Sequence, residues 1–372
     1  MSKVVLKTEN LGISFGGLKA VQNLNLEIKE KQLYGLVGPN GAGKTTVFNM
    51  ITGVYKPTTG KFWLDGEDLT GKGQEFINHK GIARMLAELK VPFDIVDENM
   101  SFEKFELLIL PDDVLITELL KEKIQKHLDK GGKVISSGIS GLNQDKTGFA
   151  LKEWEDAFEF KGLDKSNSSY FRFTKNYMDN PPDMDFSMYE YGSLFKAKQG
   201  ATVLADYVKA YFNKGWNGTH SMFYAPPEKK TGDTAIAITD NVAHICFNIF
   251  KSYNKNAMLE HKYLIKYCID RLYPNALIKH STLPSTARVT LTENAKYRNL
   301  HVKLTFPEMR GEKQVIEEHQ TVQAGHTVTV RGEYKNVYGA LDKTPVEITV
   351  ENGYTIITLP YIEGYKLFVL EK

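Results

Sequence analysis

The residues best suited to chemistry lie in one short segment near the amino terminus, Gly38-Pro39-Asn40-Gly41-Ala42-Gly43-Lys44-Thr45-Thr46. The segment fills every fixed position of the pattern G-x-x-x-x-G-K-[ST], whose glycines let backbone N–H groups turn toward phosphate oxygens. In this pattern Lys44 reaches the β- and γ-phosphates of a nucleotide, and the hydroxyl of Thr45 binds Mg²⁺. We therefore expect ATP and Mg²⁺ to be bound by Gly38, Asn40, Gly41, Ala42, Gly43, Lys44, Thr45 and Thr46.

The segments on either side are those that such a loop needs. Residues 33–37 form an apolar run typical of a buried strand, and residues 47–51 are typical of the opening of a helix. The amino end of a helix adds positive potential that favours an anion. The alternative, a glycine-rich turn without chemical meaning, does not explain these flanks.

The composition is that of an ordinary globular protein and excludes several classes of function. The chain has 372 residues, 42% hydrophobic and 25% charged, which predicts two or three domains. A net charge of +2 gives no basis for binding nucleic acid or an anionic membrane, and no apolar run has the length of a membrane helix. Cys246 and Cys268 are too few for a disulfide framework and lack metal-ligand spacing, so we expect a cytoplasmic protein with reduced thiols.

The first 84 residues differ in composition from the rest. They hold 13 of the 30 glycines but only 7 of the 42 aromatic residues, which suggests two segments of different origin that meet near Arg84. In this part we expect strands over residues 4–15, 19–28, 33–37 and 61–69, a helix over 45–52, and a helix over 76–84 interrupted at Gly81.

Three motifs of this part carry a family resemblance: "SFGGLKAVQNLNLEI", "GLVGPNGAGKTTVFNMITGVYKPTTGKFWLDGEDLTG" and "HKGIAR". On these motifs, residues 3–84 resemble the first part of an ABC transporter ATP-binding subunit of the branched-chain amino acid importer type. The resemblance implies that Phe15, the aromatic residue before the Gly-Gly turn, stacks on adenine.

The family pattern stops after Arg84. Thr-Phe-Gln is expected next, but the chain continues Met85-Leu86-Ala87, and no L-S-G-G-Q signature, Asp-Glu strand or switch histidine follows. Two segments imitate the missing ones, residues 107–113 with Asp112 and Asp113 at the strand end, and residues 136–141, but their order is reversed. Hydrolysis needs those groups, so we expect nucleotide binding without a complete ATPase.

From residue 85 onward the patterns predict a second architecture. We expect strands over 92–96, 107–111 and 133–137, and a helix over 117–130 whose apolar stripe is Ile116, Leu119, Leu120, Ile124 and Leu128. This order predicts a doubly wound parallel sheet. Residues 148–230 are expected to be irregular and aromatic-rich; core packing is the favoured interpretation and a carbohydrate-facing rim the alternative. A hairpin over 234–247, a helix over 256–272 and six strands from residue 288 are expected to follow.

The segments "VPFDIVDE", "FELLILPDDVLITELLKEKIQKHLDKGGKVISSGISGL", "LIKYCIDRLYP" and "NGYTIITLPYIEGYKLFVLE" carry a second resemblance. On these segments, residues 85–372 resemble the C-terminal part of β-galactosidase-like glycoside hydrolases. The resemblance implies an amidotransferase-like trimerisation domain over 85–283, a β-sandwich over 284–372, a homo-oligomer (a trimer) formed through the first of these, and carbohydrate as a ligand. The catalytic barrel that precedes these domains in the family has no counterpart in the chain.

No residue of the longer segment stands out as catalytic. Ser140 lacks the G-x-S-x-G spacing of a nucleophile elbow, and both cysteines lie in apolar surroundings that predict buried core residues. The acid pairs Asp112/Asp113 and Glu153/Glu155 are better explained as a strand-end turn and a solvated helix face. We therefore expect no catalytic residues and leave open whether the chain is an enzyme.

The sequence thus predicts an α/β multi-domain chain: a truncated P-loop ABC-type half-domain (1–84), a doubly wound flavodoxin- or amidotransferase-like α/β domain (85–283) and a small antiparallel β-sandwich (284–372). The favoured hypothesis is a fusion of two incomplete modules, which a genomic rearrangement or an assembly artefact would produce. Three alternatives remain: a glycosidase accessory or oligomerisation protein acting on carbohydrate, an ATP-binding protein for branched-chain amino acid import, and a nucleotide-regulated binding protein.

Overall fold

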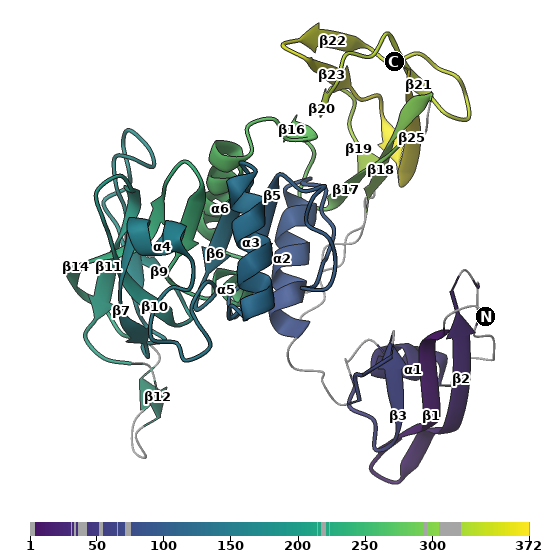
Figure 1. Ribbon diagram of the computed structural model, residues 1–372. Coiled ribbons are helices and arrows are strands. Elements are labelled where there is room, and N and C mark those ends of the chain that lie inside the picture. Colours follow the sequence, from purple (N-terminus) through teal and green to yellow (C-terminus); the bar gives the residue numbers. More distant parts are fainter. Residues whose placement is uncertain are drawn as a thin grey trace. The chain divides into compact units, whose positions relative to one another are not determined.

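The computed structural model describes residues 4–30, 32, 35, 43–51, 55–64, 66–70, 76–213, 215–216, 221–222, 224–293, 296–304 and 321–371 (Figure 1). The chain divides into two compact units, Met1–His79 and Lys80–Lys372. The division falls inside helix α2 (Phe76–Glu88). Within these described ranges, no helix combines the length and the apolar character that crossing a membrane requires.

Unit 1 is an antiparallel sheet with one helix. Its strand order is β2-β1-β3-β4, with bounds β1 Val4–Phe15, β2 Leu18–Lys29, β3 Thr59–Leu64 and β4 Glu67–Asp68. Helix α1 (Lys44–Ile51) buries Val47 and Met50 in a small core with Leu11, Ile13 and Phe62. These elements confirm the predicted strands and helix, and the predicted strand over 33–37 lies outside the described residues except for Gly35.

Unit 2 is built on a nine-stranded mixed sheet, so the predicted parallel pairing is confirmed for the strands at 107–110 and 133–137 and extends only to a third strand at 242–245. The order is β5-β6-β15-β14-β11-β8-β9, with β10 pairing to β14 and β7. Pairing is parallel from β5 to β15 and antiparallel elsewhere. The bounds are β5 Leu107–Leu110, β6 Lys133–Ser137, β7 Phe158–Asp164, β8 Tyr170–Phe173, β9 Phe186–Ser187, β10 Gly192–Ala197, β11 Thr202–Ala210, β14 Pro227–Ile238 and β15 Val242–Ile245, with a small hairpin of β12 Gly215–Trp216 and β13 Ser221–Met222.

The antiparallel half comes from residues that the sequence pattern indicated to be irregular. Strands such as β8 are buried on both faces: Tyr170, Phe171 and Phe173 are all core residues. A strand covered on both faces lacks the alternation of apolar and polar residues by which a strand is recognised. The expected strand over residues 92–96 is also wrong, because that segment has no strand pairing.

Helices α3 (Glu118–Asp129) and α6 (Leu259–Leu272) both pack against β6. The Thr117 hydroxyl accepts a hydrogen bond from the N–H of Leu120 and caps α3. Leu119, which was predicted to lie in the apolar stripe of this helix, is 43% exposed and lies outside it. The helix predicted over 256–272 corresponds to α6, which begins at Leu259. A further helix, α5 (Ile249–Asn256), was not predicted; it precedes α6 and ends at Ala257, which has φ +49°. A short helix, α4 (Lys152–Ala157), precedes β7.

The carboxyl-terminal part of unit 2 contains two four-stranded antiparallel sheets around a separate core, which confirms the predicted β-rich region. Their orders are β16-β20-β23-β22 and β17-β18-β25-β21, and Val302, Val330 and Phe368 are among the core residues. The bounds are β16 Ile278–Ser281, β17 Ala287–Glu293, β18 Tyr297–Leu304, β20 Thr327–Arg331, β21 Asn336–Gly339, β22 Ile348–Glu351, β23 Tyr354–Thr358 and β25 Tyr365–Glu371, beside the pair β19 Thr321–Val322 and β24 Ile362–Glu363.

Helix α2 runs without interruption through Gly81, contrary to the prediction. A Cβ at Gly81 would lie 2.0 Å from the carbonyl oxygen of Phe250. The glycine therefore serves the close approach of α2 to α5, not a break in the helix. Ile82, Met85 and Leu86 continue the same face into the main core of unit 2.

Replacing Gly81 by alanine tests this packing. Alanine favours an isolated helix by about 1 kcal/mol relative to glycine, but the collision with Phe250 should lower the free energy of unfolding of unit 2 by roughly 1–3 kcal/mol. Urea denaturation measures the change. Gly148→Ala is the matched control, because a Cβ there meets nothing within 4 Å; a Gly81→Ala variant at least as stable as wild type would contradict the packing argument.

Candidate phosphate-binding site

The structure describes part of the predicted site. Gly38, Asn40, Gly41 and Ala42 lie outside the described residues, as does the side chain of Thr45. The described residues of the site are Phe15, Gly43, Lys44 and Thr46, together with the backbone of Thr45 at the start of α1. They all belong to unit 1.

Gly43 is held in a position that only glycine tolerates. Its φ is +77°, and a Cβ there would lie 2.7 Å from the carbonyl oxygen of Ala20 and 3.1 Å from Cγ2 of Val21. Its own carbonyl accepts the N–H of Val47 at 2.9 Å, so the helix begins directly after it. The first N–H groups of a helix have no partner within it, and no acidic side chain occupies the first turn of α1. This end of α1 therefore fits an anionic group such as phosphate.

Phe15 lies at the same end of the β1–β2 hairpin as Gly43. It pairs with Leu18 across the turn, and Leu18 is two residues, roughly 7 Å of strand, from Ala20. The ring of Phe15 is 46% exposed and meets the ring of Tyr55 edge-on at 5.3 Å. An exposed aromatic face near the phosphate-binding helix end is suited to stacking on a base.

Asp112, at the end of the strand that imitates an ATPase element, has a structural environment in unit 2. Its carboxylate is fully buried and accepts hydrogen bonds from the Ser137 hydroxyl at 2.8 Å and from the N–H groups of Phe250 and Lys251 at 3.2 and 2.8 Å. It thus binds the amino end of α5, in keeping with the predicted strand-end turn. Burial raises the pKa of this carboxyl to about 7 against the opposing effect of these hydrogen bonds.

The pKa of Asp112 predicts a pH dependence of stability. Because the folded carboxyl holds its proton more tightly than the unfolded one, the contribution of Asp112 is greatest below pH 4 and is lost as the pH rises to about 7. Asp112→Asn should remove this part of the decline, seen as a flatter profile of unfolding free energy against pH between 4 and 7. The exposed Asp145→Asn variant should keep the wild-type slope; equal slopes in all three proteins would contradict the assignment.

A second buried polar group was not anticipated from the sequence. Nδ1 and Nε2 of His244 lie 2.8 Å from the hydroxyls of Ser136 and Ser193, and the indole N–H of Trp154 donates to Ser136. Burial lowers the pKa of His244 to about 3, so the imidazole is neutral and without access to solvent. Its partners are distant in sequence, and no local pattern marks them.

The other candidate side chains are structural. Ser140 is buried and accepts the N–H of Val114 at 2.9 Å. Both cysteines are buried as predicted, and burial raises the pKa of Cys268 to about 12. Glu153 of α4 accepts a hydrogen bond from Gln125 at 2.9 Å. Among the residues that the structure describes, no group of three His, Cys, Asp or Glu side chains is placed to hold a metal ion.

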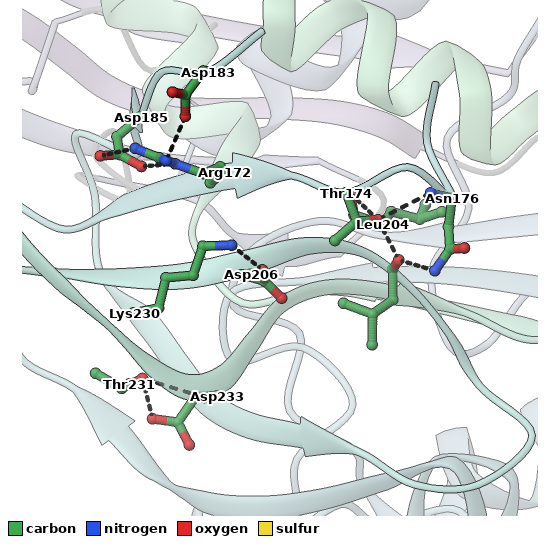
Figure 2. A network of polar contacts seen from close by, with 11 residues as sticks. Arg172, Thr174, Asn176, Asp183, Asp185, Leu204, Asp206, Lys230, Thr231 and Asp233 are labelled. Carbon is green, nitrogen blue, oxygen red and sulfur yellow. Dashed lines mark hydrogen bonds and ion pairs between the residues drawn. The ribbon is translucent and has the colours of Figure 1, made fainter. Parts of the chain in front are cut away.

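The outer face of β8, β11 and β14 carries paired charges (Figure 2). Arg172 binds both carboxylate oxygens of Asp185 at 2.7 and 2.9 Å and Asp183 at 2.8 Å, and Lys230 binds Asp206 at 2.6 Å. Charges of both signs alternate on this face, so it does not form the positive field that binds a polyanion.

The aromatic residues of this region divide into two groups. One group lies in the core, which agrees with the favoured interpretation, and includes Tyr170, Phe171, Phe173, Phe195 and Tyr207. Among the residues that the structure describes here, Tyr191, Tyr211, Phe212 and Tyr224 are exposed. The N–H of Tyr211 donates to the carbonyl oxygen of Pro226, which lies two residues after Tyr224.

Comparisons with known proteins agree with a nucleotide-binding segment. The family model for the ABC transporter matches residues 21–147. The high-affinity branched-chain amino acid transport ATP-binding protein BraF of Pseudomonas aeruginosa is 46% identical over 91 residues, 24% of this chain and 36% of that protein. LivG of Escherichia coli is 44% identical over the same shares. The chain thus spans little more than a third of the length of these relatives.

Solved structures resemble the longer part. The α-L-fucosidase isoenzyme 2 from Paenibacillus thiaminolyticus aligns with 78% of this chain and 44% of that chain, at 28% identity and a TM-score of 0.69. Since unit 1 has 79 residues, most of this match falls on unit 2. A GH42 β-galactosidase, Gan42B of G. stearothermophilus, aligns at 13% identity and a TM-score of 0.47, over 83% of this chain and 38% of that chain, which is too low to support an argument.

Both resemblances indicated by the sequence are therefore confirmed. The chain joins a segment similar to ABC transporter ATP-binding proteins to a segment similar in structure to an α-L-fucosidase. The family match extends past Arg84 through β5, α3 and β6. The structure places the two strands in the mixed sheet of unit 2 and packs α3 against β6.

Proposed function

We propose that the chain is a fusion in which an ATP-binding fragment of an ABC transporter subunit precedes the non-catalytic C-terminal part of a β-galactosidase-like glycoside hydrolase. The observation that carries the nucleotide-binding part is Gly43, whose φ and whose fit against Ala20 keep the start of α1 open to a phosphate. In this proposal neither part has a complete active site, and the protein is located in the cytoplasm.

In the proposed site each residue has a binding role. Phe15 stacks on adenine, and the backbone from Gly38 through Thr46 with Asn40 surrounds the phosphates. Lys44 neutralises the β- and γ-phosphates, and Thr45 holds Mg²⁺. Bound Mg²⁺ offsets phosphate charge. Hydrolysis does not follow, because residues 84–87 belong to α2 rather than to the glutamine segment that positions water in the family.

ATP with Mg²⁺ should raise the thermal stability of unit 1. At a nucleotide concentration 100 times the dissociation constant the gain is about 2.7 kcal/mol. Lys44→Ala should abolish the shift measured by calorimetry at millimolar ATP and Mg²⁺. Lys29→Ala is the control, since Lys29 is exposed and pairs with Val4 at the other end of the hairpin. Equal shifts in both variants, or none in the wild type, would refute ATP binding.

The exposed aromatic residues favour a second candidate function, an accessory or oligomerisation protein that acts on carbohydrate. Tyr191, Tyr211 and Tyr224 present flat rings to solvent, and such faces stack on sugars. In this candidate the α/β part assembles into a homo-oligomer, a trimer, and unit 1 contributes nothing to the assembly. Import of branched-chain amino acids, the activity in the names of the curated relatives, would need the ATPase elements that the sequence lacks.

The packing of α2 also indicates where the two sources meet. Gly81 contacts Phe250, and the Arg84 guanidinium binds Glu88 at 2.8 Å and lies 5.4 Å from the ring of Tyr253. These residues match the ABC motif by sequence but pack within unit 2. We therefore place the junction before Lys80 and not at Arg84. We also place the boundary of the β-rich part before β16 and not near residue 283, because β16 pairs with β20.

Two fragments test the junction and the assembly together. Residues 80–372 should unfold at the same urea concentration as unit 2 of the full chain, whereas residues 85–372 should be less stable by about 3–5 kcal/mol, the cost of leaving one partner of a buried ion pair. Sedimentation of the first fragment reports its oligomeric state. Equal stability of the two fragments would contradict a junction before Lys80 and favour one at Arg84. A monomeric fragment would contradict the oligomerisation hypothesis.

A further inference from the structure

The turn that ends α2 holds a lysine where helices commonly place glycine. Lys90 has φ +61°. Its N–H donates to the carbonyl of Ala87 at 3.2 Å, and the N–H of Val91 donates to the carbonyl of Leu86 at 2.9 Å. This pairing is a Schellman motif, in which the left-handed residue is usually glycine because a Cβ is strained there. A lysine kept against that strain points to a role for its side chain.

The side chain of Lys90 joins two parts of unit 2. It is 3% exposed, and its Nζ donates to the carbonyl oxygens of Glu88 at 2.9 Å and Pro284 at 2.7 Å. Pro284 lies in the segment 282–286, which connects β16 to β17 of the β-rich part. Two acceptors match the two N–H groups of a neutral amine, whereas an ammonium group has three.

A second lysine, on α6, forms a hydrogen bond to the same segment. Lys262 is buried, and its Nζ donates to the Ser285 hydroxyl at 2.8 Å and to the Glu88 carboxylate at 3.0 Å. The Glu88 carboxylate also accepts from Arg84 at 2.8 Å and from the Tyr253 hydroxyl at 2.5 Å. Helices α2, α5 and α6 thus converge on the segment through one carboxylate.

The charges around Lys90 oppose its protonation. Burial is the largest effect, and the nearby cations Arg288 and Lys262 add to it, while Glu88 acts in the opposite direction. Together they lower the pKa of Lys90 to about 7. Glu88 already serves Arg84 and Lys262, so a charge on Lys90 would have no carboxylate of its own.

We propose that Lys90 is a proton-controlled latch, whose neutral amine fastens segment 282–286 of the β-rich part to the end of α2 and whose release is coupled to proton uptake. Closing the latch buries a neutral amine, and opening it exposes the amine to water, where it binds a proton. The position of the β-rich part on the α/β part therefore responds to pH.

Linkage fixes the pH window of this response. The closed amine has a pKa of about 7 and a hydrated lysine one of 10.5, so opening takes up a proton between these values. Each unit by which the pH falls from 10.5 to 7 should favour opening by up to about tenfold, and below pH 7 the equilibrium should change no further. The latch is tightest in alkaline solution.

Hydrogen exchange of the full chain measures the opening. The peptide covering residues 282–288 should show an opening constant, corrected for the intrinsic pH dependence of exchange, that rises by up to about 100-fold from pH 9 to pH 7. Lys90→Met should make this constant independent of pH. Lys121→Met is the matched control, because Lys121 is an exposed residue of α3. A flat wild-type profile, or the same slope in Lys90→Met, would overturn the proposal.

A glycine variant separates the latch from the helix end. Lys90→Gly relieves the strain at φ +61° and should fold, because glycine suits the Schellman position. It should nevertheless raise the opening constant measured on the peptide 282–288 at pH 9, and it should remove the pH dependence of this constant. If Lys90 only ends the helix, Lys90→Gly should protect this segment as well as the wild type does, and that result would also overturn the proposal.

Discussion

The close contact of α2 with α5 at Gly81 constrains how unit 2 is assembled. Without a side chain at Gly81, the two helices come near each other. Arg84 and Glu88, one and two turns further along α2, then reach Tyr253 near the end of α5. The other end of α5 is bound by Asp112 at the end of β5. A single short helix therefore couples the edge of the mixed sheet to the residues that hold the β-rich part.

The nucleotide site proposed for unit 1 is built from local elements. Gly43, the start of α1 and the β1–β2 hairpin are contiguous or paired elements, and together they need only a small core around Leu11 and Phe62. Phosphate recognition depends on this local backbone. Hydrolysis depends on groups brought from distant segments, which is why a fragment can retain the first property without the second.

The sequence anticipated those features that depend on neighbouring residues. The strands of unit 1, the helix α3 and the carboxyl-terminal strands follow from hydrophobic periodicity and turn chemistry, and the prediction of phosphate-binding residues rests on one motif. Strands such as β8 and β10 were missed because they are buried on both faces and carry no clear alternation of apolar and polar residues. The helix α5, the Ser136–His244–Ser193 group and the environment of Asp112 depend on tertiary packing, which local patterns do not encode.

Helix α2 also has a consequence for building chimeras from this chain. The sequence of residues Gly81 to Arg84 resembles the ABC family, but these residues make their contacts within unit 2. Sequence similarity and packing therefore indicate different positions for the junction. Contacts decide whether a protein folds. A chimera that replaces the amino-terminal module should therefore be joined upstream of Lys80, so that the helix is kept whole. The residues "GIAR" should stay with unit 2, because their contacts stabilise that unit.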